Sequence, residues 1–503
     1  MNGRKGNNGM TRRQFLKKTG IGAGIITFGQ AGFAESSQLP KGISQEKHDV
    51  VVIGTGLAGL LAAIEARMNG ADVIILEKAS MNDSGGNSNL AAGVIAIPSE
   101  NTKQAKDEYY EDFIKKSMGK ADPDLTRVLA DQIFDGVDWL KAQGIEFLPP
   151  IPTPGYRVKG APVAPGLFRG MPKALGRLRD VLEKKGGKIA YETKAKELIM
   201  DSRGKVKGVK AIDSVGVKDY ISNAVILASG GFSANKEMLQ LWVDPDADAM
   251  MARGVPWSTG DGIKMAHKVG ALLVNMGGMT GLHIAAVSPK NPASGNPFVV
   301  LPFCIAINRE GKRFADESKG YVVVGKATMK QPGQKVALVF DEEIKKTPAG
   351  SANVKLFQGL GIEVFEAETI EELAAKIGGP PGALKLTIDE FNNAVKDGKA
   401  LGTKPPKEAL AHKIMTPKFY AFYPLVPGIT QTFGGIKVNT NAQVLEPDGR
   451  VIPGLYAAGE CVGGLFYDDY IGGGSLARCV VLGRIAGKNA AAEKISTKKK
   501  TTS

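Results

Sequence analysis

The sequence predicts an α/β fold organised around a buried parallel sheet, and three observations carry this prediction. An apolar run over 48–53 leads directly into a glycine-rich turn. A helical pattern over 60–69 follows the turn, and a second apolar run over 73–76 ends at Glu77. Apolar runs of this kind are typical of parallel strands that are buried on both faces. The order strand, turn, helix, strand therefore predicts a Rossmann-like unit near residue 50.

The glycine-rich turn has the spacing of a dinucleotide-binding loop. It reads Gly-Thr-Gly-Leu-Ala-Gly over 54–59. Gly54 makes the tight turn, Gly56 lets the backbone approach a pyrophosphate, and Gly59 lets the helix pack closely on the strand. Free N–H groups at the start of the helix attract phosphate. Glu77 lies 18 residues beyond Gly59, where it can accept a hydrogen bond from a ribose.

The length and composition fit two domains behind a targeting segment. The chain has 503 residues, of which 43% are hydrophobic, so it can bury more than one core. The net charge of +14 lies partly outside the expected fold, because residues 1–34 hold six Lys or Arg and no acid, and 493–503 form a basic tail. We therefore do not expect nucleic-acid binding. The cysteines form no CxxC or CxxCH motif, so no metal, iron–sulfur or covalent haem site is expected.

Residues 1–34 have the pattern of a twin-arginine signal peptide. The pair Arg12-Arg13 lies in Thr-Arg-Arg-Gln-Phe-Leu-Lys, and a Gly-rich apolar stretch over 21–33 follows it. That stretch is too short for a stable membrane span, and small residues before Glu35 suit signal-peptidase cleavage. We therefore expect a periplasmic protein that is exported folded with its cofactor and keeps no membrane span after cleavage.

The C-terminal region favours FAD over NAD. The segment 449–460 is expected to form a last short strand that ends in Ala-Gly-Glu, which would bring Glu460 to a ribityl chain. Three glycines over 472–474 then open a final helix that is expected to run to about Ala492. A helix start of this kind can place N–H groups at the flavin N1/O2 edge, which becomes negative on reduction.

These motifs resemble the fumarate reductase/succinate dehydrogenase flavoprotein superfamily. The resemblance runs from His48 to Ala492 and includes the segments 84–93, 228–232, 259–263 and 307–314. It implies a Rossmann-like FAD-binding domain of the glutathione-reductase type with an inserted α+β capping domain. The cofactor-binding residues that we expect are Gly54, Gly56, Leu57, Ala58, Gly59, Glu77, Lys78, Gly86, Asn87, Ser88, Ala92, Gly93, Ala228, Ser229, Gly230, Asp261, Gly459, Glu460, Ser475 and Leu476.

The resemblance also implies the division of the chain. The FAD-binding domain is expected over 48–271 and 428–492, and the capping domain over 272–427, with the substrate between cap and flavin. Ser88 stands where membrane-bound members tether FAD through a His, so we expect non-covalent FAD. The chain has no haem motif, so a separate redox partner such as a cytochrome is expected.

Three positions depart from the fumarate reductase pattern. Tyr321 stands at the place of the proton-donating arginine after the Arg-Phe-x-x-Glu segment, and Tyr470 at the place of a carboxylate-binding arginine. Gln431 replaces a His that also holds the dicarboxylate. Loss of one buried ion pair costs about 3–5 kcal/mol, so fumarate is not an expected substrate.

With a tyrosine at both places, the active-site pattern instead most resembles that of the 3-ketosteroid dehydrogenases. That resemblance implies that Tyr470 O–H and the Gly474 N–H polarise a ketone, and that Tyr321 exchanges the proton on the adjacent carbon. Tyr156 and His283 are weaker candidates, and a structural role is favoured for His283. The expected enzyme acts on a CH–CH bond next to a carbonyl, as an enone or enoate reductase or a ketosteroid-type dehydrogenase.

Two alternatives stay open at this point. One is a carboxylate reductase of the fumarate or urocanate kind, which arginines near the flavin N5 would indicate. The other is a flavin electron-transfer subunit of a cytochrome complex, with no substrate of its own. The sequence leaves the substrate, the physiological direction, the redox partner and the oligomeric state undetermined.

Overall fold

The computed structural model describes residues 44–147, 170–247, 250–277, 282–286, 295–467 and 469–499. The expected signal peptide and Tyr156 lie outside these residues. No helix among those described is both long and apolar enough to cross a membrane.

A six-stranded sheet forms the centre of the expected FAD-binding part, in the order β17-β18-β8-β2-β3-β4. Its bounds are β2 (Val50–Ile53), β3 (Val73–Leu76), β4 (Lys188–Ala190), β8 (Ala224–Leu227), β17 (Gln443–Leu445) and β18 (Val451–Ala457). All neighbours are parallel except β17 and β18. Every residue of β2, β3 and β8 is buried, as continuous apolar runs predict. Segments that are distant in the sequence therefore share one sheet.

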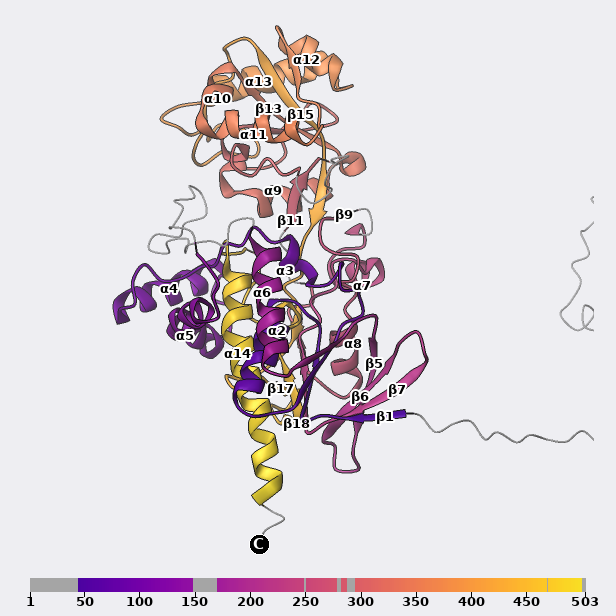
Figure 1. Ribbon diagram of the computed structural model, residues 1–503. Coiled ribbons are helices and arrows are strands. Elements are labelled where there is room, and N and C mark those ends of the chain that lie inside the picture. The colour runs from indigo at the N-terminus through magenta and orange to yellow at the C-terminus, as the bar shows by residue number, and fades with distance from the viewer. Residues whose placement is uncertain are drawn as a thin grey trace, which may run out of the picture. The chain divides into compact units, whose positions relative to one another are not determined.

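Two helices pack against each other beside this sheet, α2 (Leu57–Met68) and α14 (Gly474–Lys499), as Figure 1 shows. Their contact is close because α14 carries glycines there. A Cβ on Gly483 would lie 2.8 Å from the Ala58 carbonyl oxygen, and one on Gly487 would lie 2.2 Å from that of Ala62. The start of α14 is therefore fixed relative to the glycine-rich turn.

Further helices complete this part of the fold. They are α3 (Gly86–Leu90), α4 (Lys103–Lys116), α5 (Pro123–Ala142), α6 (Met171–Lys184), α7 (Lys236–Trp242) and α8 (Asp261–Lys268). A small sheet has the order β1-β7-β6-β5, with β1 (Ser44–Lys47), β5 (Lys194–Met200), β6 (Val206–Ile212) and β7 (Val217–Ile221).

A second six-stranded sheet lies largely within 272–427, the range expected for the cap. It contains β9 (Met251–Ala252), β11 (Leu282–Ala285), β12 (Ile305–Asn308), β13 (Val336–Asp341), β14 (Phe365–Ala367) and β15 (Phe419–Ile429). Its helices are α9 (Tyr321–Met329), α10 (Glu342–Lys346), α11 (Pro348–Gly359), α12 (Ile370–Lys376) and α13 (Pro381–Ala394). Two apolar clusters share β12, β13 and β15, one with α9 and α11 and one with α12 and α13.

The structure differs from the sequence expectations at several boundaries. Helix α2 begins at Leu57 rather than near residue 60, and α14 continues to Lys499, so 493–499 is helical rather than part of a tail. The cap boundaries are also crossed. Strand β10 (Leu273–Val274) pairs with β16 (Gly435–Ile436), and β9 joins the cap sheet through β15. Short backbone pairings of this kind leave little trace in hydrophobic periodicity.

A buried ion cluster supports the segment that precedes α9. The Glu317 carboxylate contacts the Arg313 guanidinium at 2.9 Å and the Lys407 ammonium at 3.5 Å, and it accepts the Ala306 N–H at 2.7 Å. Both acidic and basic side chains are almost completely buried. This cluster fixes the short 3-10 turn Glu317–Lys319, directly before the first residue of α9, Tyr321.

One buried carboxyl group outside the cap lacks a hydrogen bond. Asp112 on α4 is 7% exposed, and its Oδ2 has no hydrogen-bond partner in the described part of the chain. Burial raises the pKa of Asp112 to about 6. The folded protein therefore holds this proton at pH values where the unfolded chain, with a pKa near 4, has released it.

We predict that Asp112→Asn removes a pH-dependent loss of stability. The folded-state pKa of this acid is raised, so the wild-type protein loses stability as pH rises from about 4 to 6 and then stays level. Relative to the wild type, the variant should gain about 2 kcal/mol over that interval. Urea unfolding at pH 4.5, 5.5 and 7 measures this difference. Asp138→Asn, at an exposed carboxylate, is the control. A gain in the free energy of unfolding of Asp112→Asn that does not change with pH would contradict the prediction.

Candidate active site

The expected cofactor residues gather at one edge of the central sheet. Most follow the carboxyl ends of the parallel strands β2, β3, β8 and β18, or lie at the starts of α2, α3, α8 and α14, whereas Ala92 and Gly93 follow the end of α3. In an open α/β sheet this edge is where ligands bind. These residues are separated by more than four hundred positions along the chain, and the parallel pairing of the strands brings them together.

The three glycines of the turn differ in the space around them. Gly54 has φ +101°, and a Cβ there would lie 2.6 Å from the Ala228 carbonyl oxygen. A Cβ on Gly59 would lie 2.0 Å from the Gly54 carbonyl oxygen. A Cβ on Gly56 would meet only ordinary contacts, 3.6 Å from Ser88 Oγ. Gly54 and Gly59 are therefore required by packing, whereas Gly56 leaves its backbone open to a ligand.

Glu77 holds the turn in place. Its Oε2 accepts hydrogen bonds from the Thr55 N–H at 2.9 Å and the Thr55 hydroxyl at 2.5 Å, and its Oε1 accepts the Ala79 N–H at 2.9 Å. The Thr55 hydroxyl in turn accepts the Gly85 N–H at 3.0 Å. A carboxylate oxygen has two lone pairs, so Oε1 can accept a ribose hydroxyl as well. Sequence reasoning missed Thr55, because an unspecified position of a motif gives no signal.

Helix α3 connects the turn to the end of β18. The Ser88 hydroxyl accepts the Leu57 N–H at 3.1 Å. The Asn87 amide donates to the Thr430 carbonyl at 2.8 Å and to Glu460 Oε2 at 3.0 Å, and its oxygen accepts the Val255 N–H at 2.9 Å. Asn87 therefore ties three segments together at the site.

Glu460 is a half-buried acid at the end of β18. Its Oε1 accepts the Thr432 N–H at 2.9 Å, and a Cβ on Gly231 would lie 2.3 Å from the same oxygen. Burial raises the pKa of Glu460 above its usual value, although hydrogen bonds from Thr432 and Asn87 and the charge of Arg478 oppose this. A half-buried carboxyl group can still accept hydrogen bonds from a ligand that offers hydroxyl donors.

Lys78 and Asp261 form an ion pair with each other at 2.8 Å, and Lys78 also donates to the Thr259 hydroxyl at 2.7 Å. Burial alone would raise the pKa of Asp261, but the hydrogen bond and charge of Lys78 hold it below its usual value. The Ser229 hydroxyl accepts the Gly262 N–H at 3.2 Å. These residues therefore close the sheet edge at β3 and β8.

The start of α14 brings together two of the three departures from the fumarate reductase pattern. The Ser475 hydroxyl donates to Gln431 Oε1 at 2.5 Å, and the Ser475 N–H donates to the Tyr470 hydroxyl oxygen at 3.4 Å. The Tyr470 ring stacks on Phe433, with centroids 5.8 Å apart, and meets the edge of Phe466 at 5.3 Å. Tyr470 is therefore held beside Ser475 by aromatic packing.

The Gly474 N–H, expected in an oxyanion hole with Tyr470, donates to the Ile471 carbonyl at 2.8 Å in this structure. The amide nearest to the phenol is therefore that of Ser475. The first turn of a helix has N–H groups that lack an intrahelical acceptor, and Leu476 belongs to the same turn.

Tyr321 lies on a different element from Tyr470. It is the first residue of α9 in the expected cap, and its half-buried ring packs against the apolar cluster that contains Val324 and Leu338. The backbone of His283 pairs with Gly428 on β15. The described residues contain no cluster of His, Cys, Asp or Glu that could hold a metal ion.

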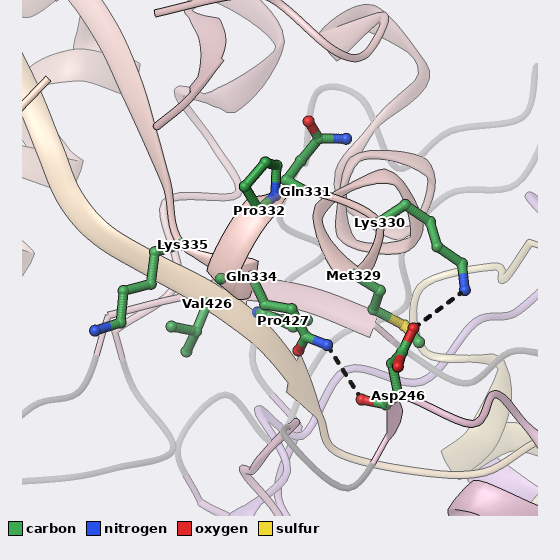
Figure 2. Close-up of a pocket in the computed structure, with 10 residues that line it drawn as sticks. Asp246, Met329, Lys330, Gln331, Pro332, Gln334, Lys335, Val426 and Pro427 are labelled. Atoms are coloured by element: carbon green, nitrogen blue, oxygen red, sulfur yellow. Dashed lines mark hydrogen bonds and ion pairs between the residues drawn. The ribbon is translucent and has the colours of Figure 1, made fainter. Parts of the chain in front are cut away.

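An open groove of about 640 Å³ lies beside the cap and contains none of the expected site residues (Figure 2). The end of α9, the following turn and β15 line it together with Asp246. Lys330 on the cap forms an ion pair with Asp244 at 2.6 Å, and the Gln334 amide donates to the Asp246 carbonyl at 3.2 Å. The groove is therefore bounded by polar contacts between α9 and the loop after α7.

The sequence matches the FAD binding domain family over residues 49–476. The chain therefore belongs to this family. It is a FAD-dependent oxidoreductase of the superfamily that includes fumarate reductases and 3-ketosteroid dehydrogenases.

Three relatives illustrate the range of the similarity. The chain is 31% identical to the NADH:acrylate oxidoreductase of Vibrio harveyi, over 89% of this chain and 50% of the relative, so it spans only half of that protein. It is 30% identical to the fumarate reductase (cytochrome) of Shewanella frigidimarina, over 88% of this chain and 77% of the relative. It is also 30% identical to the vinyl phenol reductase of Lactiplantibacillus plantarum, over 88% of this chain and 95% of the relative.

Two solved structures share the fold. The open conformation of a flavocytochrome c3 fumarate reductase has a TM-score of 0.74 at 28% identity, and covers 89% of this chain and 78% of that one. A 3-ketosteroid-Δ4-(5α)-dehydrogenase from Rhodococcus jostii, in complex with 4-androstene-3,17-dione, has a TM-score of 0.71 at 25% identity, and covers 91% and 99%. The mixed α/β fold is therefore that of the FAD-binding flavoproteins.

The second and third glycines of the turn, Gly56 and Gly59, give a paired prediction. Gly56→Ala should keep the fold and weaken FAD binding at least tenfold, because a methyl group would occupy the open side of the turn. Gly59→Ala should abolish both folding and FAD binding, because its methyl group would overlap the Gly54 carbonyl. Fluorescence titration of the apoprotein with FAD and far-UV circular dichroism measure these effects. Wild-type FAD affinity in Gly56→Ala would contradict the expected role of that residue.

Proposed function

We propose that this enzyme reduces, or forms in the reverse direction, a carbon–carbon double bond conjugated to a carbonyl group. The observation that most supports this proposal is the hydrogen-bonded cluster of Tyr470, Ser475 and Gln431 at the start of α14. Hydroxyl and amide groups occupy this place, where the fumarate reductase pattern has a guanidinium and an imidazole. Neutral donors suit a ketone or enone oxygen better than a dicarboxylate.

In this proposal the chain's own groups handle the carbonyl and the proton. The Tyr470 hydroxyl, with an amide of the α14 first turn, donates hydrogen bonds to the carbonyl oxygen as negative charge develops on it. Tyr321 gives a proton to the carbon next to the carbonyl in reduction, and takes it in dehydrogenation. The bound FAD supplies or accepts the hydride at the following carbon. Closure of the cap over 272–427 would exclude water during that transfer.

The rest of the proposal concerns the context of the enzyme. We infer a Rossmann-like domain of the glutathione-reductase type, and a twin-arginine signal in 1–34 that directs the protein to the periplasm. A separate cytochrome is the proposed redox partner in an anaerobic respiratory role. Support for this comes from the basic, acid-free N-terminal segment and from the relatives, one of which is named as a cytochrome-type fumarate reductase.

A second candidate is reduction of a carboxylate-bearing acceptor. Most of the named relatives above are reductases of fumarate or acrylate, which favours it. The vinyl phenol reductase, which this chain matches over almost its whole length, favours an acceptor without a carboxylate. The aromatic packing around Tyr470 agrees better with an acceptor that lacks a carboxylate.

We predict that Tyr321→Phe slows re-oxidation of the reduced flavin by the productive acceptor by about 10²–10⁴-fold, because the proton donor is lost. The holoenzyme is photoreduced without oxygen and mixed with 2-cyclohexenone, a steroid enone, 4-vinylphenol, fumarate or urocanate in a stopped-flow spectrometer. FAD content should not change.

The matched control is Tyr423→Phe, at another half-buried tyrosine in the cap, whose ring contacts Phe365. An unchanged rate for Tyr321→Phe would remove the proton-donor assignment. Fast re-oxidation by fumarate and none by the neutral acceptors would replace the leading proposal with the second candidate.

A further inference from the structure

Arg478 on α14 is a fully buried cation whose hydrogen-bonding capacity is only partly used. It is 0% exposed and is among the largest completely buried side chains of the described residues. Its Nη1 donates to the Val462 carbonyl at 2.9 Å, and its guanidinium lies over the Phe466 ring, 5.0 Å from the centroid. Its Nε and Nη2 have no hydrogen-bond partner, and within the described ranges no carboxylate lies within 4.0 Å of it.

Such a group is costly to bury, so its position calls for an explanation. A buried guanidinium without an anion loses its hydration, and each unused N–H adds to the free-energy cost. Arg484, two turns further along the same helix, shows the usual solution. It pairs with Glu65 at 3.2 Å and also lies over an aromatic ring, Trp139. Arg478 keeps the ring contact and the carbonyl, but among the described residues it has no anionic partner.

Arg478 lies one turn beyond the start of the helix that is expected at the FAD site. It lies three residues, about one turn, beyond Ser475, in the helix whose first-turn N–H groups are expected at the flavin edge that becomes negative on reduction. Its charge acts on Glu460, the acid expected at the ribityl chain, and lowers the pKa of that group against the effect of desolvation. In a buried environment, a unit charge interacts strongly with another charge about one helical turn away.

We propose that the positive charge of Arg478 raises the reduction potential of the bound FAD, because it stabilises the negative charge of the reduced ring. Reduction adds two electrons and one proton to the isoalloxazine and leaves one negative charge on it. The oxidised ring is neutral, so the field of Arg478 favours the reduced form selectively. The proposal depends on FAD binding and not on the identity of the organic substrate.

The test is the midpoint potential of the bound FAD, measured by equilibration of the full-length holoenzyme with redox dyes. Arg478→Met should lower the ratio of reduced to oxidised flavin at a fixed potential at least tenfold, which is a shift of about −30 mV for a two-electron couple. Arg478→Lys should keep most of the wild-type ratio. Both variants should bind oxidised FAD with nearly wild-type affinity, because the oxidised ring carries no charge.

Arg484→Met is the matched control, since it removes a cation from the same helix together with an aromatic contact, and its flavin ratio should stay within twofold of the wild type. An unchanged or higher potential in Arg478→Met would overturn the proposal, and would indicate that ordered water satisfies Nε and Nη2. If Arg478→Met does not fold, Arg478→Gln is measured instead. Failure of both neutral variants to fold or to bind oxidised FAD, while Arg478→Lys does so, would also overturn the proposal, because the charge would then serve the oxidised protein.

Discussion

The close approach of α2 to its neighbours is the constraint on which the site depends. On one side, Gly59 allows the helix to lie against the turn after β2, where a Cβ would be 2.0 Å from the Gly54 carbonyl oxygen. On the other side, Gly483 and Gly487 allow α14 to lie directly on α2. A side chain at any of these positions would separate the helices, and the start of α14 would then no longer face the glycine-rich turn. The glycine-rich turn and the cluster of Tyr470, Ser475 and Gln431 are therefore parts of one packing arrangement.

This arrangement explains how distant segments form one site. Glu77 fixes the turn through Thr55, and Asn87 connects α3 to the Thr430 carbonyl and to Glu460. The end of β18 and the start of α14 follow each other at the same edge of the sheet. Tyr470 lies between them, supported by Phe433 and Phe466. Hydrogen bonds and ring packing thus set the position of Tyr470, whereas a buried ion cluster fixes the turn directly before Tyr321.

The sequence predicted the nucleotide-binding core well because its signals are local. The apolar runs of β2 and β3, the glycine spacing and the acid at Glu77 are all visible within thirty residues, and the structure confirms both runs as buried strands. The ribose contact of Glu77 stays a prediction. The boundaries between cap and core were less predictable, since β10 and β9 are two-residue strands that pair across the chain. Two hydrogen bonds could not be predicted from hydrophobic periodicity, because they depend on tertiary geometry. They join Ser475 to Gln431 and the Gly474 N–H to the Ile471 carbonyl. Arg478 gave no signal either, because nothing in its local sequence shows that it is buried.

The central claim is that neutral hydrogen-bond donors at the start of α14 stabilise an enolate oxygen. The most direct test is to titrate the oxidised holoenzyme with substituted phenols, which mimic an enolate, and with malonate, which mimics a dicarboxylate, while following the flavin absorbance. The account predicts that the phenols bind and perturb the flavin spectrum, that Tyr470→Phe weakens this binding at least tenfold, and that malonate has little effect. Tight binding of malonate with no response to the phenols would contradict it.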